Sequence, residues 1–362
     1  MNESIAQLAA SRRQAILRTL SEHGSVRIAS LADELGVTPV TLRRDLQQME
    51  AQGLLVRVHG GAVAPEGGIP PSLEQPRTTI QSVGVLVPSL SYYWPSVLAG
   101  VEERANAHGA RVLLRGASYE LQDERPVLER MVNRDGVDAF VVAPNTNTPH
   151  AGDVVEWLYD TGLPFVLAER DAVMPTDGMP AESVTTDHAL GAAMAAHHLA
   201  ELGHRRVGLI RTEDSPTSRK IVAGWGPGCE SAGVASHQYL VADHRTPSFI
   251  ESAAGVLDRL RDDGVTGLLV HADPEALAFV DLVLARGLSV PGDLSVIAYD
   301  DETAHLGSPA LTAIRPPRAE LGRAAFDLLL GRLADPDRAA HRVTLSPSIN
   351  RRASTAAPGR MS

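Results

Sequence analysis

Hydrophobic and polar residues follow two different patterns along the chain. In the first 64 residues, apolar side chains recur at helical spacing, as with Leu42, Leu46 and Met49 on one face of a single stretch. From Ile80 onward, short apolar runs of strand length alternate with longer amphipathic stretches. Such an alternation is typical of parallel sheets covered by helices on both faces. The two patterns predict a small helical head followed by a large α/β body.

The head pattern predicts three short helices and a hairpin. The first helix ends at Gly24, and Ser30 is expected to cap a second helix that ends at Gly36. Thr38 followed by Pro39 then begins a third helix, because threonine is a good cap and proline suits the first helical position. Two short strands around a Gly-Gly turn follow, which is typical of a β-wing. Together these elements predict a winged helix-turn-helix.

The outer surface of this head carries side chains suited to DNA. Arginine pairs bidentately with guanine in the major groove, and threonine can meet a thymine methyl group or a phosphate. An isolated arginine pair is more often a solvated helix face, but the caps, the turn and the wing together favour DNA contact. We expect contacts from the third helix and the wing at Thr38, Val40, Thr41, Arg43, Arg44, Arg57, His59 and Gly60.

The charge of the chain is divided unevenly between head and body. The whole chain has 33 basic and 44 acidic residues and a net charge of −11, which argues against a protein whose entire surface binds nucleic acid. Residues 1–64 carry a net charge of +1, however, and the remaining 298 residues carry −12. A small DNA-binding head on an acidic body is therefore compatible with the composition.

The sequence pattern of the body predicts parallel sheets in two lobes. About 270 residues are too many for one such sheet of ordinary size, so we expect two similar lobes with a ligand-binding crevice between them. Residues 65–79 contain four prolines and two glycines and are expected to form a linker. The runs predicted as strands are residues 83–88, 111–114, 138–144, 164–168, 206–210, 266–270 and 294–300.

Polar and aromatic side chains follow several predicted strand ends, where α/β folds bind ligands. We expect contacts to a small polar ligand from Tyr92, Tyr93, Trp94, Glu169, Arg219 and Asp300. The aromatic run can stack on a sugar or a base, or pack the start of a helix. The two carboxylates can accept hydrogen bonds from hydroxyl groups, although a solvated turn or an inter-lobe salt bridge also suits Asp300. For Arg219 a surface ion pair is the equal alternative.

The head resembles the winged helix-turn-helix of the deoxyribose-operon-repressor (DeoR) type. The resemblance extends from Arg12 to Ala62 and is carried by the segments LADELGVT, TLRRDL and RVHGGA. About fifty residues with many fixed spacings take part. One small departure is Thr38, where serine is more usual, and both residues cap helices.

The body resembles the periplasmic-binding-protein-like effector domain of the lactose/galactose-repressor (LacI/GalR) family. The motifs that carry this resemblance occur in family order at residues 83–90, 162–167, 187–191, 198–210, 287–301 and 309–314. The resemblance implies a homodimer formed through the effector domains. It also places effector contacts on the aromatic run at residues 92–94, on Glu169 and on Asp300.

The resemblance also implies an organisation of the body. The two lobes are expected to be joined by three crossovers, near Asp187, near residues 308–314 and near residues 331–335. The expected parts are a head (1–64), a linker (65–79), a body (80–350) with lobe 1 (80–187 and 309–332) and lobe 2 (188–308 and 333–350), and a flexible tail (351–362).

Two departures from the family pattern fall in the expected crevice. The family's usual arginine before its A-G-W/F motif is Ile221 here, and the usual asparagine after the strand TGLLV is Ala272. These changes weaken the expectation of a common hexose held in the usual way. The family's own DNA-binding head and hinge helix are absent from this sequence.

Enzyme and metal functions lack support in the sequence. It contains no phosphate-binding loop, no G-x-S-x-G and no H-E-x-x-H motif. His197, His198 and His204 lack a partner at ligand spacing, and Cys229, the single cysteine, is interpreted as a packing residue. We therefore expect no enzyme activity, no cofactor and no metal.

The sequence predicts a ligand-controlled transcription regulator, most simply a repressor, that binds operator DNA and a sugar or nucleoside. The N-terminus lacks the features of a signal peptide and no run approaches membrane-spanning length, so a cytoplasmic protein without membrane contact is expected. The alternative is a sugar-binding or sugar-processing protein whose head serves only for assembly.

Overall fold

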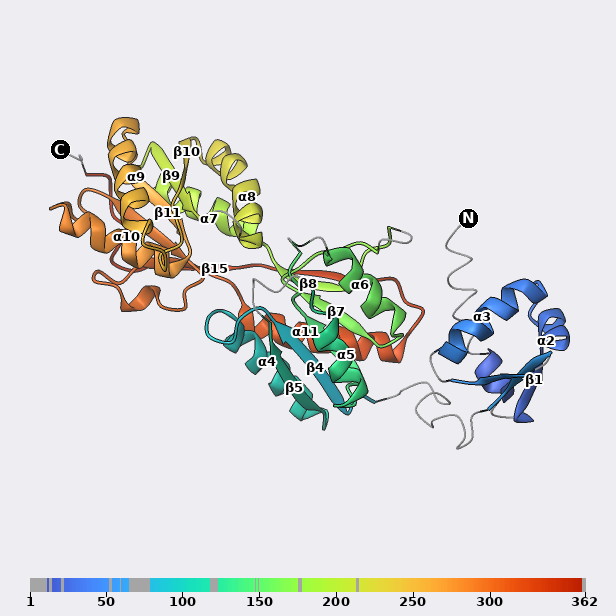
Figure 1. The fold of residues 1–362 in the computed structure, drawn as a ribbon. Coiled ribbons are helices and arrows are strands. Elements are labelled where there is room, and N and C mark those ends of the chain that lie inside the picture. Colours follow the sequence, from blue (N-terminus) through green and yellow to red (C-terminus); the bar gives the residue numbers. More distant parts are fainter. Residues whose placement is uncertain are drawn as a thin grey trace. The chain divides into compact units, whose positions relative to one another are not determined.

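The structure is a computed structural model of the 362-residue chain, and the chain divides into two compact units between Thr79 and Ile80 (Figure 1). The side chains of residues 33, 40, 44, 48 and 51 are not described. The described residues are 12, 15–20, 23–51, 54–58, 60–64, 79–117, 123–146, 148, 150–174, 178–212 and 215–359.

The head is a winged helix-turn-helix, as predicted. Its sheet has the order β1-β3-β2 with antiparallel pairing, and Leu42, Leu46 and Met49 are fully buried on one face of α3. The predicted linker between the two units lies, apart from Thr79, outside the described residues. The elements of the head are β1 (Ser25–Arg27), α2 (Ile28–Glu34), α3 (Pro39–Ala51), β2 (Val56–Val58) and β3 (Gly61–Val63).

One detail of the head differs from the prediction. Helix α2 begins at Ile28, so Ser30 lies inside it and is not its cap. The backbone N–H of Ile28 donates to the carbonyl of Gly60 at 2.9 Å, which ties the start of this helix to the wing turn. A side chain at Gly61 would place its Cβ 2.0 Å from the carbonyl oxygen of Val26, so glycine there serves strand pairing.

The body has two lobes, each built on a six-stranded sheet. The lobe 1 sheet has the order β14-β8-β7-β6-β4-β5, and every neighbouring pair is parallel. The elements of lobe 1 are β4 (Ser82–Val87), α4 (Trp94–Ala107), β5 (Arg111–Gly116), α5 (Arg125–Asn133), β6 (Ala139–Val142), α6 (Ala151–Asp160), β7 (Phe165–Ala168), β8 (Ser183–Thr186), α11 (Arg318–Ala334) and β14 (Arg342–Leu345).

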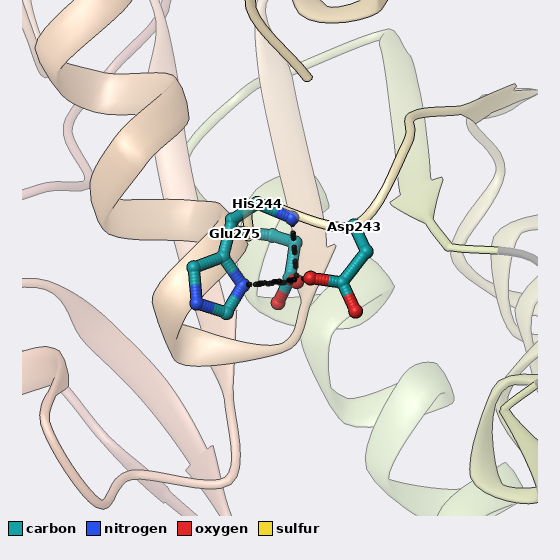
Figure 2. Close-up of side chains that lie close together, drawn as sticks. All are labelled: Asp243, His244 and Glu275. Atoms are coloured by element: carbon teal, nitrogen blue, oxygen red, sulfur yellow. Dashed lines mark hydrogen bonds and ion pairs between the residues drawn. The ribbon is translucent and has the colours of Figure 1, made fainter. Parts of the chain in front are cut away.

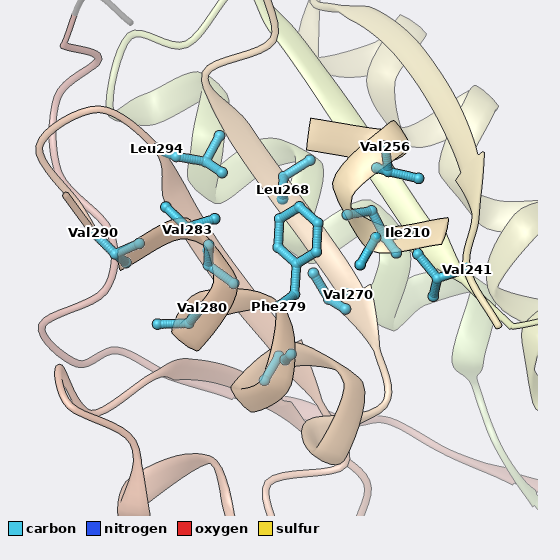
Figure 3. Packing of buried hydrophobic residues seen from close by; sticks show 14 of the residues in the cluster. Ile210, Val241, Val256, Leu268, Val270, Phe279, Val280, Val283, Val290 and Leu294 are labelled. Carbon is cyan, nitrogen blue, oxygen red and sulfur yellow. The ribbon is translucent and has the colours of Figure 1, made fainter. Parts of the chain in front are cut away.

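Lobe 2 has the sheet order β10-β9-β11-β12-β13-β15, which is parallel except for β15 on β13. On one side of this sheet, Phe279 of α10 is buried in a cluster with Leu268 and Val270 of β11 (Figure 3). The elements of lobe 2 are α7 (His188–Glu201), β9 (Arg206–Arg211), α8 (Pro216–Ala232), β10 (Ala235–Leu240), α9 (Phe249–Asp263), β11 (Gly267–His271), α10 (Asp273–Ala285), β12 (Ser295–Tyr299), η2 (Ala304–Leu306), β13 (Thr312–Arg315) and β15 (Ser348–Asn350).

The chain crosses between the lobes three times, but two crossovers lie later than predicted. The first follows β8 at Asp187, as expected, and the Asp187 carboxylate caps α7 by accepting from the N–H of Leu190 at 2.8 Å. The second lies between β13 and α11, because β13 pairs with β12 of lobe 2. The third lies between β14 and β15, since β14 pairs with β8 of lobe 1. Residues 309–315 therefore belong to lobe 2, and residues 333–345 to lobe 1.

The tail over residues 351–359 packs on lobe 2, so the prediction that it is flexible is wrong for these residues. The hydroxyl of Ser354 is fully buried, donates to the carbonyl of Val296 at 2.5 Å and accepts from the N–H of Thr312 at 2.8 Å. His204 and the carbonyl of Ala356 lie at hydrogen-bond distance, 3.0 Å. Residues 360–362 lie outside the described part of the chain.

Candidate functional site: an inter-lobe cleft and a DNA-binding surface

A cleft of about 1550 Å³ lies between the two lobes. Its walls are the loops and helix starts that follow the carboxyl ends of strands, where α/β sheets bind ligands. All six residues predicted to contact a ligand line it: Tyr92, Tyr93, Trp94, Glu169, Arg219 and Asp300.

Asp300 follows β12 in lobe 2 and is bound from lobe 1. The hydroxyl of Tyr92 donates to its Oδ2 atom at 3.0 Å, so this pair joins the two walls of the cleft. Only 4% of Asp300 is exposed, and burial raises its pKa to about 6, although His188, Tyr92 and Arg318 act in the opposite direction. A carboxylate with this pKa can accept a ligand hydroxyl at neutral pH.

Glu169 follows β7 in lobe 1, and both of its carboxylate oxygens have hydrogen-bond partners within the protein. Its Oε1 accepts from the hydroxyls of Tyr93 and Thr186, and its Oε2 accepts from the N–H of Thr186 at 3.1 Å and lies 3.1 Å from Nε2 of His188. Burial alone raises the pKa of Glu169, but His188 and the hydroxyl donors lower it to about 2. Because both oxygens are occupied, Glu169 acts on the cleft mainly by orienting Tyr93.

A buried chain of side chains continues from Glu169 to lobe 2. Nδ1 of His188 lies 2.9 Å from the hydroxyl of Tyr299, the residue before Asp300. This chain passes through the first crossover, because His188 begins α7 directly after Asp187. The group formed by Tyr93, Glu169, Thr186, His188 and Tyr299, called here the crossover cluster, therefore connects the two lobes at the base of the cleft.

Trp94 is mainly a packing residue. It begins α4, is 2% exposed and meets the ring of Tyr93 edge-on, with 5.5 Å between ring centroids. The guanidinium of Arg170 lies 5.8 Å from the Trp94 ring centroid and donates to the carbonyl of Pro144 at 3.1 Å. Of the three aromatic residues, Tyr92 and Tyr93 are the ones with part of their surface open to the cleft.

Lobe 2 contributes cleft residues that sequence reasoning missed, including Arg211, Ser218, Arg245 and His271. Arg211 and His271 are the last residues of adjacent strands, so their position after apolar runs could have indicated them. Ser218 and Arg245 lie where no apolar run marks a strand end, and the sequence pattern contains no comparable signal for them.

Asp243, His244 and Glu275 form a further group at the cleft (Figure 2). Nδ1 of His244 lies 2.7 Å from Oε1 of Glu275, and the other Glu275 oxygen accepts from the N–H of Ala272 at 3.1 Å. Asp243 is paired with Arg245, with 2.5 Å between Nη2 and Oδ2. These side chains satisfy one another, and the prediction that the chain holds no metal stays a prediction.

The head presents part of the predicted DNA surface on α3. Thr38 caps the helix, because the N–H of Thr41 donates to its hydroxyl at 3.2 Å. Arg43 is exposed. The side chains of Val40 and Arg44 lie outside the described residues.

The wing carries the remaining predicted DNA contacts. Nε of Arg57 on β2 donates to Oε2 of Glu50 on α3 at 2.6 Å, which orients the arginine and lowers the pKa of Glu50. Gly60 is exposed at the turn with φ of +81°, a conformation that favours glycine. His59 lies outside the described residues.

Comparisons with known proteins agree with this architecture. Residues 12–67 match the DeoR-like helix-turn-helix domain, and residues 196–355 match the periplasmic binding protein-like domain. The chain is similar to the arabinose metabolism transcriptional repressor of Geobacillus stearothermophilus, with 25% identity over 83% of this chain and 82% of that protein. It is also similar to the transcriptional repressor CytR of Escherichia coli K12, with 27% identity over 71% of this chain and 74% of that protein.

A solved structure shows the same fold for the body. The LacI family transcriptional regulator from Enterococcus faecium, with bound ribose, covers 76% of this chain and 99% of its own length at 24% identity and a TM-score of 0.62. The two relatives are named as transcriptional repressors, the class of protein that the sequence predicts. Within the described part of the chain, no helix has the length and apolarity needed to span a bilayer.

Proposed function

Because the chain is a helix-turn-helix transcriptional regulator with a DeoR-like head and a periplasmic-binding-protein-like effector domain, we propose that it is a repressor controlled by a ligand in its cleft. The ligand is a small polar molecule, a sugar or a nucleoside. The protein acts in the cytoplasm as a homodimer, so that two heads meet two half-sites of one operator.

The observation that carries this function is the contact of Tyr92 with Asp300 across the cleft. A ligand hydroxyl that donates to Asp300 competes with Tyr92 or joins it, and therefore changes how the two lobes are held together. A ligand shifts such an equilibrium by its difference in affinity for the two arrangements. The arabinose regulator and the ribose-bound structure among the similar proteins support a saccharide as the ligand.

The DNA-binding half of the proposal is tested with the full chain and labelled DNA from upstream of its own gene. Arg43→Ala is expected to weaken binding about 5- to 150-fold, because an arginine contact to a base contributes about 1–3 kcal/mol. The matched control is Arg18→Ala, which removes the same charge from an exposed arginine in the first helix.

Fluorescence anisotropy at several salt concentrations gives the result. If Arg43→Ala binds like the wild type and Arg18→Ala does not, the assignment of α3 to the major groove is wrong. A DNA signal that is insensitive to salt and to sequence would favour the alternative, a sugar-binding protein whose head serves assembly.

A further inference from the structure

Arg211 is the last residue of β9 and faces the cleft from lobe 2. In the sheet it stands between Leu240 of β10 and His271 of β11, and both of these residues also line the cleft. Arg211 is only partly exposed. Arg211 therefore belongs to the part of lobe 2 that lines the cleft, where its side chain is partly shielded from solvent.

The described residues provide few partners for the Arg211 guanidinium. Among the described residues, the one hydrogen bond of the Arg211 side chain is a long contact of 3.5 Å from Nη1 to the carbonyl of Thr212. Its Nε atom is buried without a hydrogen-bond partner, and no carboxylate of the described chain lies within ion-pair distance. A partly buried guanidinium with this few partners is unfavourable unless an acceptor reaches it.

Two described acidic residues of lobe 2 that line the cleft, Asp243 and Glu275, already have partners. Asp243 is held by Arg245, and Glu275 is held by His244 and by the N–H of Ala272 (Figure 2). The neighbouring His271 is buried, and this burial lowers its pKa to about 4. It is therefore neutral at pH 7 and carries no charge that could balance that of Arg211.

Helix α8 adds to the positive potential at this wall. It is 17 residues long, and its first turn lines the cleft at Ser215, Pro216, Thr217 and Ser218. The N-terminus of a helix carries a partial positive charge and favours anions. Arg219 in the same turn lines the cleft as well.

We infer that the effector carries an anionic group, a phosphate or a carboxylate, which binds Arg211 of β9 and faces the first turn of α8. A hydroxyl of the same molecule binds Asp300. The planar fork of arginine matches both oxyanions with two parallel hydrogen bonds. A neutral sugar would supply no counter-ion to Arg211, which has none among the described residues. This inference rests on the proposed function, because it assumes that the cleft holds the effector.

The test compares matched pairs of compounds on the full chain at constant ionic strength. The pairs are ribose and ribose 5-phosphate, glucose and glucose 6-phosphate, and glucose and gluconate, with inorganic phosphate as a further probe. The variants are Arg211→Gln and the matched control Arg206→Gln, which removes the same charge from an exposed residue at the opposite end of β9. Thermal-shift titrations give apparent affinities.

At least one anionic compound is expected to stabilise the wild type and Arg206→Gln with similar affinity. Arg211→Gln should bind it about 10- to 100-fold more weakly, because a hydrogen bond to a charged group contributes more than one between neutral groups. Phosphate esters and gluconate separate the two kinds of anion. If only inorganic phosphate binds, or if no anion stabilises the wild type more than Arg211→Gln, the inference is wrong.

The outcomes distinguish this inference from the function on which it rests. A neutral sugar that binds with equal affinity to the wild type and to Arg211→Gln, and that changes operator binding, keeps the proposed function and overturns the anionic ligand. Loss of operator binding under every condition overturns the proposed function, whichever compound binds in the cleft.

Discussion

Glu169 and Arg211 lie in the same cleft but in opposite situations. Glu169 in lobe 1 is surrounded by donors from Tyr93, Thr186 and His188, which occupy both of its oxygens. Among the described residues, Arg211 in lobe 2 makes one long hydrogen bond and has a buried Nε atom without a partner. The comparison teaches that a charged residue at a strand end can either hold the lobes in place or remain available to a ligand.

The largest expected effect is the loss of stability when Glu169, whose two oxygens are occupied, is replaced. Glu169→Ala should destabilise the body by about 3–5 kcal/mol, because it leaves the buried donors of the crossover cluster without an acceptor. Glu169→Gln is the matched control and should cost less, since its amide oxygen still accepts hydrogen bonds. Urea denaturation followed by circular dichroism measures both. Equal stability of the Ala variant and the wild type would contradict the role of Glu169 in the crossover cluster.

A second expected effect is a pH dependence of stability that comes from Asp300, the buried carboxylate of lobe 2, and not from Glu169. The pKa of Asp300 is raised to about 6, so the folded protein keeps this proton at a pH where the unfolded chain has released it. The contribution of Asp300 to the free energy of unfolding therefore falls as the pH rises from about 4 to about 6. Asp300→Asn should lack this component while its amide oxygen still accepts from Tyr92.

The measurement is the difference in unfolding free energy between Asp300→Asn and the wild type at several pH values. This difference should move in favour of the variant by on the order of 2 kcal/mol between pH 4 and pH 7 and then level off. A difference that is independent of pH would show that Asp300 titrates normally and is not buried as described.

The smallest effect concerns an exposed contact between the lobes. Lys220 of α8 donates to Asp171 of lobe 1 at 2.9 Å, but both side chains are about one-third exposed. Lys220→Met should change the free energy of unfolding by less than about 1 kcal/mol, because solvent screens such pairs. A loss as large as that of Glu169→Ala would mean that surface pairs, and not the crossover cluster, hold the lobes together.

Much of the fold could be predicted because apolar runs and helix caps are local signals. All seven predicted strands are present, and Thr38 caps α3 as expected. Strands β8, β10, β13, β14 and β15 were not predicted. SVTT of β8 and ASHQYL of β10, for example, contain too few apolar residues to stand out. The later crossovers were misplaced because β13 and β14 can be assigned to a lobe only from their pairing partners.

The candidate site could be predicted in part. Its six residues line the cleft because each follows a strand or begins a helix there. The sequence does not contain the partners of each residue, which come from distant segments. It could not show that both oxygens of Glu169 are occupied by residues such as Thr186 and His188, or that Asp243 and Glu275 are paired with other residues.

The central claim is that a ligand in the cleft controls DNA binding, and operator affinity with and without ligand tests it most directly. Anisotropy is measured with labelled operator, wild type and Asp300→Ala, at saturating concentrations of the compound that gives the largest thermal shift. The operator Kd of the wild type should change at least about fivefold, and this change should vanish in Asp300→Ala. An equal change in both proteins, or none in the wild type, would contradict the claim.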